Sequence, residues 1–105
     1  MTEDQDKLNI LRKINNNPHV NQRELARDLG FSLGKLNYCL KALTNKGLIK
    51  IKNFKKNPNK VSYIYILTPK GLTIKATLTL NFMKRKMIEY DELKAELEKE
   101  NKLKN

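Results

Sequence analysis

The sequence predicts a mainly α fold with one β-hairpin, which belongs to the α+β class. Apolar residues recur at steps of three and four in three segments before residue 48 and again after residue 69, as helices require. Between these regions the pattern changes to the alternating, β-branched and aromatic character of strands, over residues 48–54 and 61–67. A chain of 105 residues has room for one small core, so these elements form one module with attachments.

The first two predicted helices are short and have clear boundaries. The first covers residues 3–15 and carries acids in its first turn, where the helix dipole favours them. The second begins after Asn21, which lies three residues ahead of Glu24 in the spacing of a capping box. It ends at Gly30, a typical C-terminal stop.

The third predicted helix lies in residues 32–47, with Ser32 as its N-cap and Gly47 at its end. Leucines at steps of three and four form its core-facing side. A short helix, a turn with glycine and a longer helix together indicate a helix-turn-helix. On the side away from the leucines this helix carries two lysines and a tyrosine, Lys35, Tyr38 and Lys41, and has no acid in its own sequence.

The segment after the third helix predicts a hairpin whose loop, residues 55–60, forms a basic tip. Thr68 and Pro69 then fit the N-cap and first position of a last helix over residues 69–102, in which Gly71 is only a mild local cost. Such a helix is roughly 50 Å long, more than so small a body can cover. We therefore expect a second copy of the chain to cover its apolar residues, which are Leu72, Ala76, Leu80, Met83, Met87, Tyr90, Leu93 and Leu97.

The positive charge of the chain is concentrated in one region. The formal net charge is +11, and between Asp28 and Glu89 there are 12 lysines and one arginine but no acid. A solvated protein surface normally mixes both signs. The one-sided charge of the third helix and the hairpin therefore indicates an anionic partner, with nucleic acid favoured.

The order of elements is that of a winged helix-turn-helix, with residues 1–68 as the DNA-binding domain and residues 69–105 as a helix for dimerisation. In this fold the third helix enters the major groove and the hairpin, or wing, lies on the neighbouring backbone. Five lysines are expected to neutralise phosphates: Lys35, Lys41, Lys55, Lys56 and Lys60. The other expected DNA contacts are Ser32, Asn37 and Tyr38 as readers of base edges, Gly34 for close approach, and Asn59 at the wing tip.

Two other binding functions remain open at the level of sequence. The winged helix could be a protein-interaction module that docks on an acidic partner, or the same surface could bind RNA. Enzyme activity is not expected, because the chain has neither a phosphate-binding glycine loop nor a nucleophile beside a base. We also expect no cofactor and no metal, since His19 is the only histidine and has no ligand partner at a suitable spacing.

The single cysteine and the absence of membrane signals suggest a location. Cys39 borders the apolar side of the third helix and is expected to be a small buried hydrophobe, with a redox-sensing thiol as the alternative.

The N-terminus has no signal-peptide core, and no apolar run could span a bilayer. Six acids within residues 89–100 also argue against membrane-surface binding by the last helix. The expected location is the cytoplasm.

The chain resembles the small MarR-type winged-helix regulators associated with exopolysaccharide gene clusters. The resemblance covers about residues 5–97 and rests on three stretches, "QRELARDLGFSLGKLNYCLKALTNKGLIK", "NFKKNPNKVSYIYILTPKG" and "KATLTLNFMKRKMIEYDEL". It implies a homodimeric, sequence-specific DNA-binding transcriptional regulator of surface-polysaccharide genes. A two-fold dimer would bind a pseudo-palindromic site.

Two departures from typical MarR proteins shape this expectation. The chain is short and lacks their additional C-terminal helix, which argues against a small-molecule effector pocket. Its wing tip also offers lysines where many MarR proteins place an arginine, and lysine favours phosphate contact over readout of the minor groove.

Overall fold

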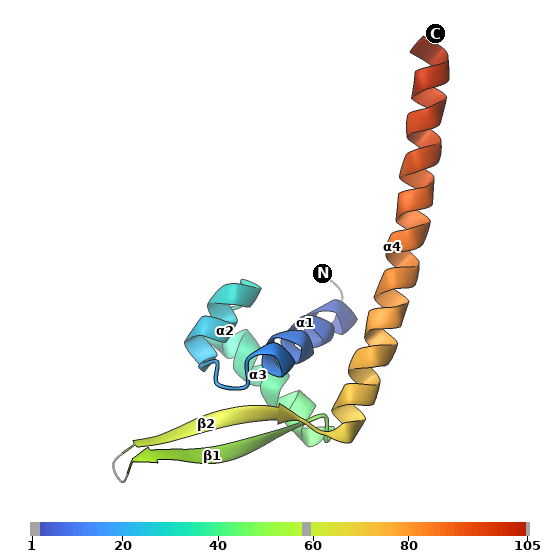
Figure 1. The fold of residues 1–105 in the computed structure, drawn as a ribbon. Helices are drawn as coiled ribbons and strands as arrows, with labels where there is room; N and C mark the ends of the chain where they lie inside the picture. The colour runs from blue at the N-terminus through green and yellow to red at the C-terminus, as the bar shows by residue number, and fades with distance from the viewer. Residues whose placement is uncertain (1–2, 58–59, 105) are drawn as a thin grey trace.

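A computed structural model describes residues 3–57 and 60–104 of the chain. Three short helices and a two-stranded hairpin form the body, and one long helix leaves it (Figure 1). The elements are α1 (Glu3–Asn16), α2 (Gln22–Leu29), α3 (Leu33–Asn45), β1 (Ile49–Asn57), β2 (Lys60–Leu67) and α4 (Pro69–Lys104). The predicted winged helix-turn-helix with a long C-terminal helix is therefore confirmed.

The helix boundaries follow the local signals in the sequence. The Asn21 side chain accepts a hydrogen bond from the backbone N–H of Glu24 at 2.8 Å, and Ser32 caps α3 in the same way. Gly30 ends α2 in the left-handed conformation with φ of 71°, which glycine adopts at little cost. These three residues fix the turn between α2 and α3.

The core lies where the three short helices meet the base of the hairpin. Its apolar side chains come from every element of the body: Ile10, Leu11, Ile14, Val20, Leu25, Ala26, Phe31, Leu36, Leu40, Leu43, Leu48, Ile49, Tyr65 and Leu67. Burying this cluster orients α3 against α1 and α2, because the leucines of α3 occupy only one of its sides.

The hairpin is antiparallel and longer than predicted. Its ladder pairs Ile49 with Leu67 at the base and continues outward to the pairing of Asn57 with Lys60, with an irregularity between Lys55 and Asn57. The predicted loop over residues 55–60 was therefore too long, because the hydrogen bonds of the ladder join backbone groups and continue past the residues whose composition indicated a turn. The hairpin projects away from α4 (Figure 1).

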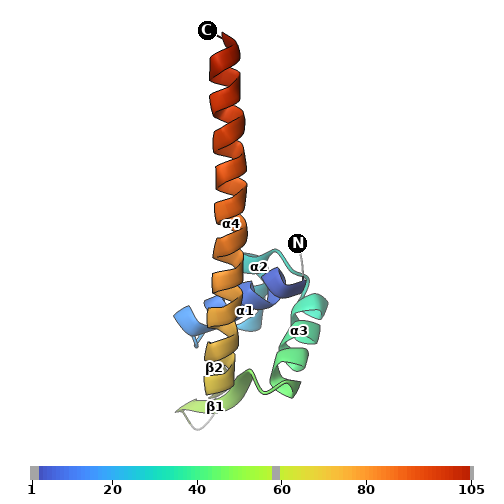
Figure 2. The same ribbon diagram turned by 90° about the vertical axis from the view of Figure 1, so that its right-hand side faces the viewer.

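The helix α4 packs on the body only through its first turns. Ile74 and Leu78 contact the core, whereas the C-terminal part of the helix rises clear of the body (Figure 2). The molecule consequently measures 72 × 26 × 21 Å. Ala76 is exposed, and the seven large residues expected to dimerise are each 47% exposed or more: Leu72, Leu80, Met83, Met87, Tyr90, Leu93 and Leu97.

Thr68 ties the end of α3 to the start of α4. Its hydroxyl donates to the Gly47 carbonyl oxygen at 2.6 Å and accepts a hydrogen bond from the Gly71 N–H at 3.0 Å. Its own N–H donates to the Leu48 carbonyl oxygen at 3.0 Å. We call these four residues the Thr68 joint.

Gly71 is far more constrained than the sequence indicates. A Cβ atom at this position would overlap the carbonyl oxygen of Leu48 and lie 2.9 Å from its carbonyl carbon. The sequence predicted only a mild local cost in helix propensity, and the structure adds a packing constraint, because glycine here allows α4 to touch the backbone that follows α3.

Candidate nucleic-acid interface

The helix α3 turns one side fully to solvent. Leu36, Leu40 and Leu43 are buried, and at 100° per residue the opposite side carries four exposed residues. We call these the outward face of α3: Gly34, Tyr38, Lys41 and Asn45. Tyr38 is 78% exposed, which is unusual for so large an aromatic ring without a partner to contact.

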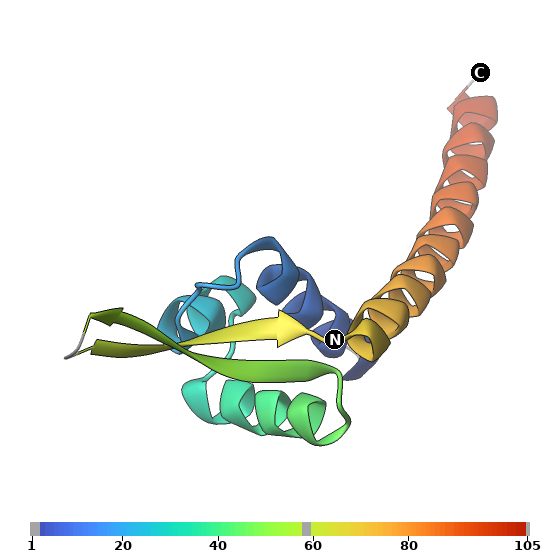
Figure 3. The same cartoon turned by 60° about the horizontal axis from the view of Figure 1, so that its bottom comes forward.

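A groove separates α3 from the base of the wing. Asn37, Lys41 and Asn45 line its helical side, and Ile51 and Tyr65 line the side of the hairpin. Its volume is about 220 Å³. In Figure 3 the hairpin runs beside α3, so a nucleic-acid backbone entering this groove would meet the amide and ammonium groups of α3 on one side and Ile51 and Tyr65 of the hairpin on the other.

Most residues that line the groove were not among the predicted contacts, and two of these carry side-chain amides, Gln22 and Asn45. Gln22, at the start of α2, donates from Nε2 to the Tyr65 hydroxyl at 2.7 Å and so links α2 to the wing. Asn45 lies one turn beyond Lys41, and that four-residue spacing could have identified it from sequence. For Gln22 the sequence held no such signal, because its partner belongs to a distant strand.

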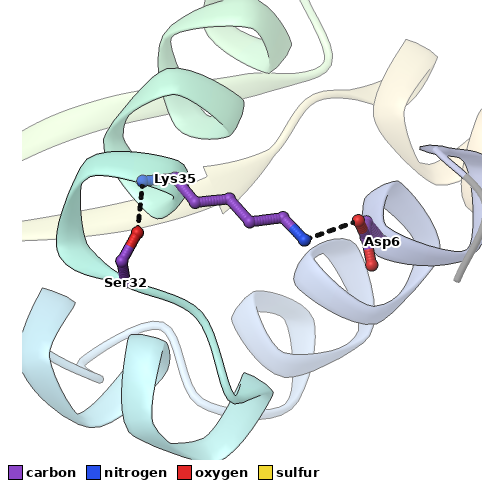
Figure 4. A network of polar contacts seen from close by, with 3 residues as sticks. All are labelled: Asp6, Ser32 and Lys35. Atoms are coloured by element: carbon purple, nitrogen blue, oxygen red, sulfur yellow. Dashed lines mark hydrogen bonds and ion pairs between the residues drawn. The ribbon is translucent and has the colours of Figure 1, made fainter.

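Lys35 contacts the body of the protein. Its ammonium lies 3.0 Å from Oδ2 of Asp6 in α1 and 4.0 Å from the centre of the Phe31 ring (Figure 4). The side chain of Lys35 is 45% exposed and that of Asp6 only 13%. Asp6 therefore provides Lys35 with an acidic partner, which the sequence of α3 does not contain. The predicted contact of Lys35 with a DNA phosphate stays a prediction.

Ser32 combines a capping role with its predicted role in DNA binding. Its Oγ accepts a hydrogen bond from the backbone N–H of Lys35 at 3.1 Å (Figure 4). The hydroxyl proton is not used by that bond and can be donated to an acceptor outside the protein.

We expect Lys35→Met to lower the free energy of unfolding by about 1–2 kcal/mol, since it leaves the Asp6 carboxylate without its cation. The cost should be appreciable because Oδ1 of Asp6 is already buried with no hydrogen-bond partner within residues 3–57 and 60–104. The double variant Lys35→Met/Asp6→Leu should regain most of the loss. Urea unfolding checks this, with Lys41→Met as the control expected to change stability by less than about 0.5 kcal/mol. A double variant less stable than the single one would contradict it.

Cys39 lines a pocket of about 480 Å³ between α1 and α3. Burial, and after it the negative charge of Asp6, raises the pKa of the thiol above its ordinary value, while Lys35 acts in the opposite direction. A raised pKa keeps the thiol protonated near neutral pH and slows its oxidation. The half-buried side chain therefore fits the predicted hydrophobe better than a redox sensor.

The wing presents lysines along its described part. Lys50 and Lys52 are exposed and alternate with Ile49 and Ile51, as the period of a strand requires. The backbones of three predicted contacts, Lys55, Lys56 and Lys60, belong to the outer part of the strands, but their side chains are not among those that the structure describes. Asn59 lies outside the described residues altogether. These four contacts stay predictions.

The described ranges contain neither a metal cluster nor a membrane span. No group of three or more His, Cys, Asp and Glu side chains there could hold a metal ion. Among the same residues, no helix has the length and apolar character needed to cross a membrane.

Comparisons with known proteins agree with this architecture. Residues 4–50 match the family model described as winged helix-turn-helix DNA-binding. No curated protein matches the chain.

Several solved structures share the fold at low sequence identity. MarR of Staphylococcus aureus, solved with salicylate and kanamycin, has a TM-score of 0.64 at 22% identity, over 82% of this chain and 56% of its own. FabT of Streptococcus pneumoniae, solved with DNA, has 0.61 at 23% identity, over 82% and 58%. The PcaV transcriptional regulator of Streptomyces coelicolor has 0.68 at 16% identity, over 79% and 60%.

The chain thus spans little more than half the length of these solved chains. The similarity to them extends over about four fifths of this chain. The protein therefore has the winged helix-turn-helix fold found in MarR-type regulators.

Proposed function

We propose that the protein is a transcriptional regulator that binds double-stranded DNA, with α3 in the major groove and the wing on the adjacent backbone. The outward face of α3 carries this proposal, since it combines Lys41 with the exposed ring of Tyr38 and contains no acid. The match of residues 4–50 to a DNA-binding winged-helix model supports it. The likeness to FabT, which was solved with DNA, supports it at the level of fold.

The roles of the residues follow from their positions. Lys41, and the lysines of the wing, would neutralise phosphates and supply most of the affinity. Tyr38 and Asn37 would contact base edges, where an asparagine can pair with adenine. Gly34, with open space around it, would let α3 approach the DNA closely.

We further propose a homodimer in which α1 and α4 form the interface and residues 69–105 act as the dimerisation helix. The exposed apolar residues of α4 support this arrangement. Such a dimer would bind a pseudo-palindromic site with half-site centres about 34–36 Å apart. The resemblance to exopolysaccharide-associated MarR-type regulators suggests surface-polysaccharide genes as targets.

Selection of bound sequences from random duplex DNA tests this function. We expect a two-fold symmetric motif, because each protomer would read one half-site. A preference for structured RNA over any duplex would instead support RNA binding.

We expect Tyr38→Ala and Asn37→Ala each to weaken binding to the selected motif by about 10-fold to 100-fold, since removing a base contact costs about 1–3 kcal/mol. Binding to unrelated DNA should change far less, because phosphate contacts remain. Fluorescence anisotropy measures both affinities. These variants are preferable to charge reversal at Lys35, which would place an acid against Asp6.

The matched control is Lys102→Ala, which removes an exposed side chain of α4 far from the outward face. If Tyr38→Ala and Asn37→Ala bind the motif as the control does, neither Tyr38 of the outward face nor Asn37 of the groove reads DNA. That result would favour the protein-interaction alternative.

A further inference from the structure

The apolar residues of α4 fall on two opposite sides of the helix. At 100° per residue, Ile74 and Leu78 lie together on the side that packs on the core. Several apolar residues farther along the chain lie on the far side, where the helix has left the body (Figure 2). We call five of them the α4 stripe: Met83, Met87, Tyr90, Leu93 and Leu97, each more than half exposed.

The spacing of the α4 stripe is symmetric about Tyr90. The steps along it are four, three, three and four residues, so the pattern is the same in both chain directions. A second copy running in the opposite direction would therefore place Met83 against the partner's Leu97 and Met87 against the partner's Leu93. The two Tyr90 rings would meet at the centre. Apolar contact alone permits a parallel pair as well.

The charges beside the α4 stripe distinguish the two directions. Residues 80–89 hold three basic residues and one acid, whereas residues 91–100 hold five acids and two lysines. A parallel pair would align each of these halves with its own copy. An antiparallel pair aligns each half with the half of opposite charge, which is the favourable arrangement.

The positions of individual charges lead to the same choice. On the helical wheel Lys84 and Glu98 lie on one side of the centre line of the α4 stripe, and Lys86 and Glu96 lie on the other side. In an antiparallel pair, each side of the α4 stripe lies next to the same side of the partner's stripe. This brings Lys84 near the partner's Glu98 and Lys86 near the partner's Glu96. In a parallel pair opposite flanks meet, so Lys84 would face the partner's Lys86. The exposed contact of Lys86 with Glu89 at 3.4 Å within α4 is weak enough to be replaced.

We propose that two copies of the chain pair through α4 in antiparallel orientation, with the two-fold axis at Tyr90. This inference rests on the homodimer of the proposed function, but it restricts the interface to α4 and leaves α1 outside it. The partner covers the α4 stripe, and the two winged helices lie at opposite ends and on outer sides of the helix pair.

The arrangement also sets the distance between the DNA-binding units. The body packs beside Ile74 and Leu78, around 14 residues before Tyr90, which is about 21 Å along the helix. The two bodies would then lie about 42 Å apart along α4. This distance is similar to the roughly 34–36 Å of one helical turn of DNA.

Cysteine cross-linking of the full chain tests the orientation. In a Cys39→Ala background, the single variants Met83→Cys, Tyr90→Cys and Leu97→Cys place a thiol at the ends and centre of the α4 stripe. Antiparallel pairing predicts a Tyr90→Cys disulfide. It predicts none for Met83→Cys or Leu97→Cys alone, because their Cβ atoms would be about 21 Å apart and a disulfide needs about 4 Å. A mixture of these two variants after subunit exchange should form the heterodimeric disulfide.

The outcomes separate this inference from the proposed function. If Met83→Cys and Leu97→Cys each form a disulfide by themselves, and their mixture forms no heterodimeric disulfide, the pair is parallel. This result would overturn the inference while leaving a dimer. A monomer in sedimentation that still binds the selected DNA would overturn both the pairing and the dimer, but not DNA binding. An antiparallel dimer that binds no DNA would leave the inference standing and overturn the proposed function.

Discussion

We expect Gly71→Ala to lower the free energy of unfolding by about 3 kcal/mol or more. The added methyl group would overlap the Leu48 carbonyl oxygen, and overpacking against a well-packed site costs about 1–3 kcal/mol even when side chains can yield. Here the obstacle is backbone, and the Thr68 N–H is bonded to the same oxygen. The oxygen cannot move away without weakening the Thr68 joint. Urea unfolding followed by circular dichroism measures the loss.

Gly34→Ala is the matched control for that substitution. A Cβ atom at Gly34 would have nothing within 4 Å, and alanine is the better helix former by about 1 kcal/mol. Its stability should therefore stay the same or rise. If Gly71→Ala unfolds within about 1 kcal/mol of the parent protein, the close contact between α4 and Leu48 is not tight in solution.

The second large effect concerns salt. We expect DNA affinity to fall about a thousandfold between roughly 50 and 200 mM monovalent salt, because six or more phosphate contacts would release that many condensed counterions. Anisotropy titrations at several salt concentrations give the slope of log affinity against log salt. Lys41→Gln should make the slope shallower by about one unit, because it removes one phosphate-neutralising charge.

Lys102→Gln controls for the change in net charge. It removes the same charge from an exposed position on α4, outside the expected contact surface, and should leave the slope unchanged. An affinity that is insensitive to salt would contradict phosphate contact as the main source of binding. Equal changes in slope for the two variants would show a general charge effect without a defined DNA surface.

The features that the sequence predicted well are those with local causes. Asn21 and Ser32 cap the helices that follow them, and Gly30 ends α2, because each interaction involves residues within a few positions. The apolar repeat of α3 likewise predicted which of its sides would be buried, whereas the repeat of α4 did not include Ile74 and Leu78, which pack on the core. For such elements, the interactions that determine the structure lie within a few residues and can be predicted from a single sequence.

The features that could not be predicted depend on contacts between distant segments. Nothing near Gly71 in sequence shows that the carbonyl of Leu48 lies against it. The pairing of Lys35 with Asp6 is equally invisible, because it needs α1 and α3 to be packed before the charges meet. The exposed position of Tyr38 was predicted from periodicity, but the groove between α3 and the wing required the register of the hairpin.

The Thr68 joint has a mechanical consequence. The hydroxyl and the N–H of Thr68 connect the backbone after α3 with the first turn of α4, so the start of α4 is held directly against the end of α3. A two-fold assembly built on such a joint would hold its two α3 helices at a nearly fixed distance from each other. That distance could change only if the contacts of the Thr68 joint were broken. It would reject DNA whose half-sites carry the right bases at the wrong distance, so the spacing of an operator would be read as strictly as its sequence.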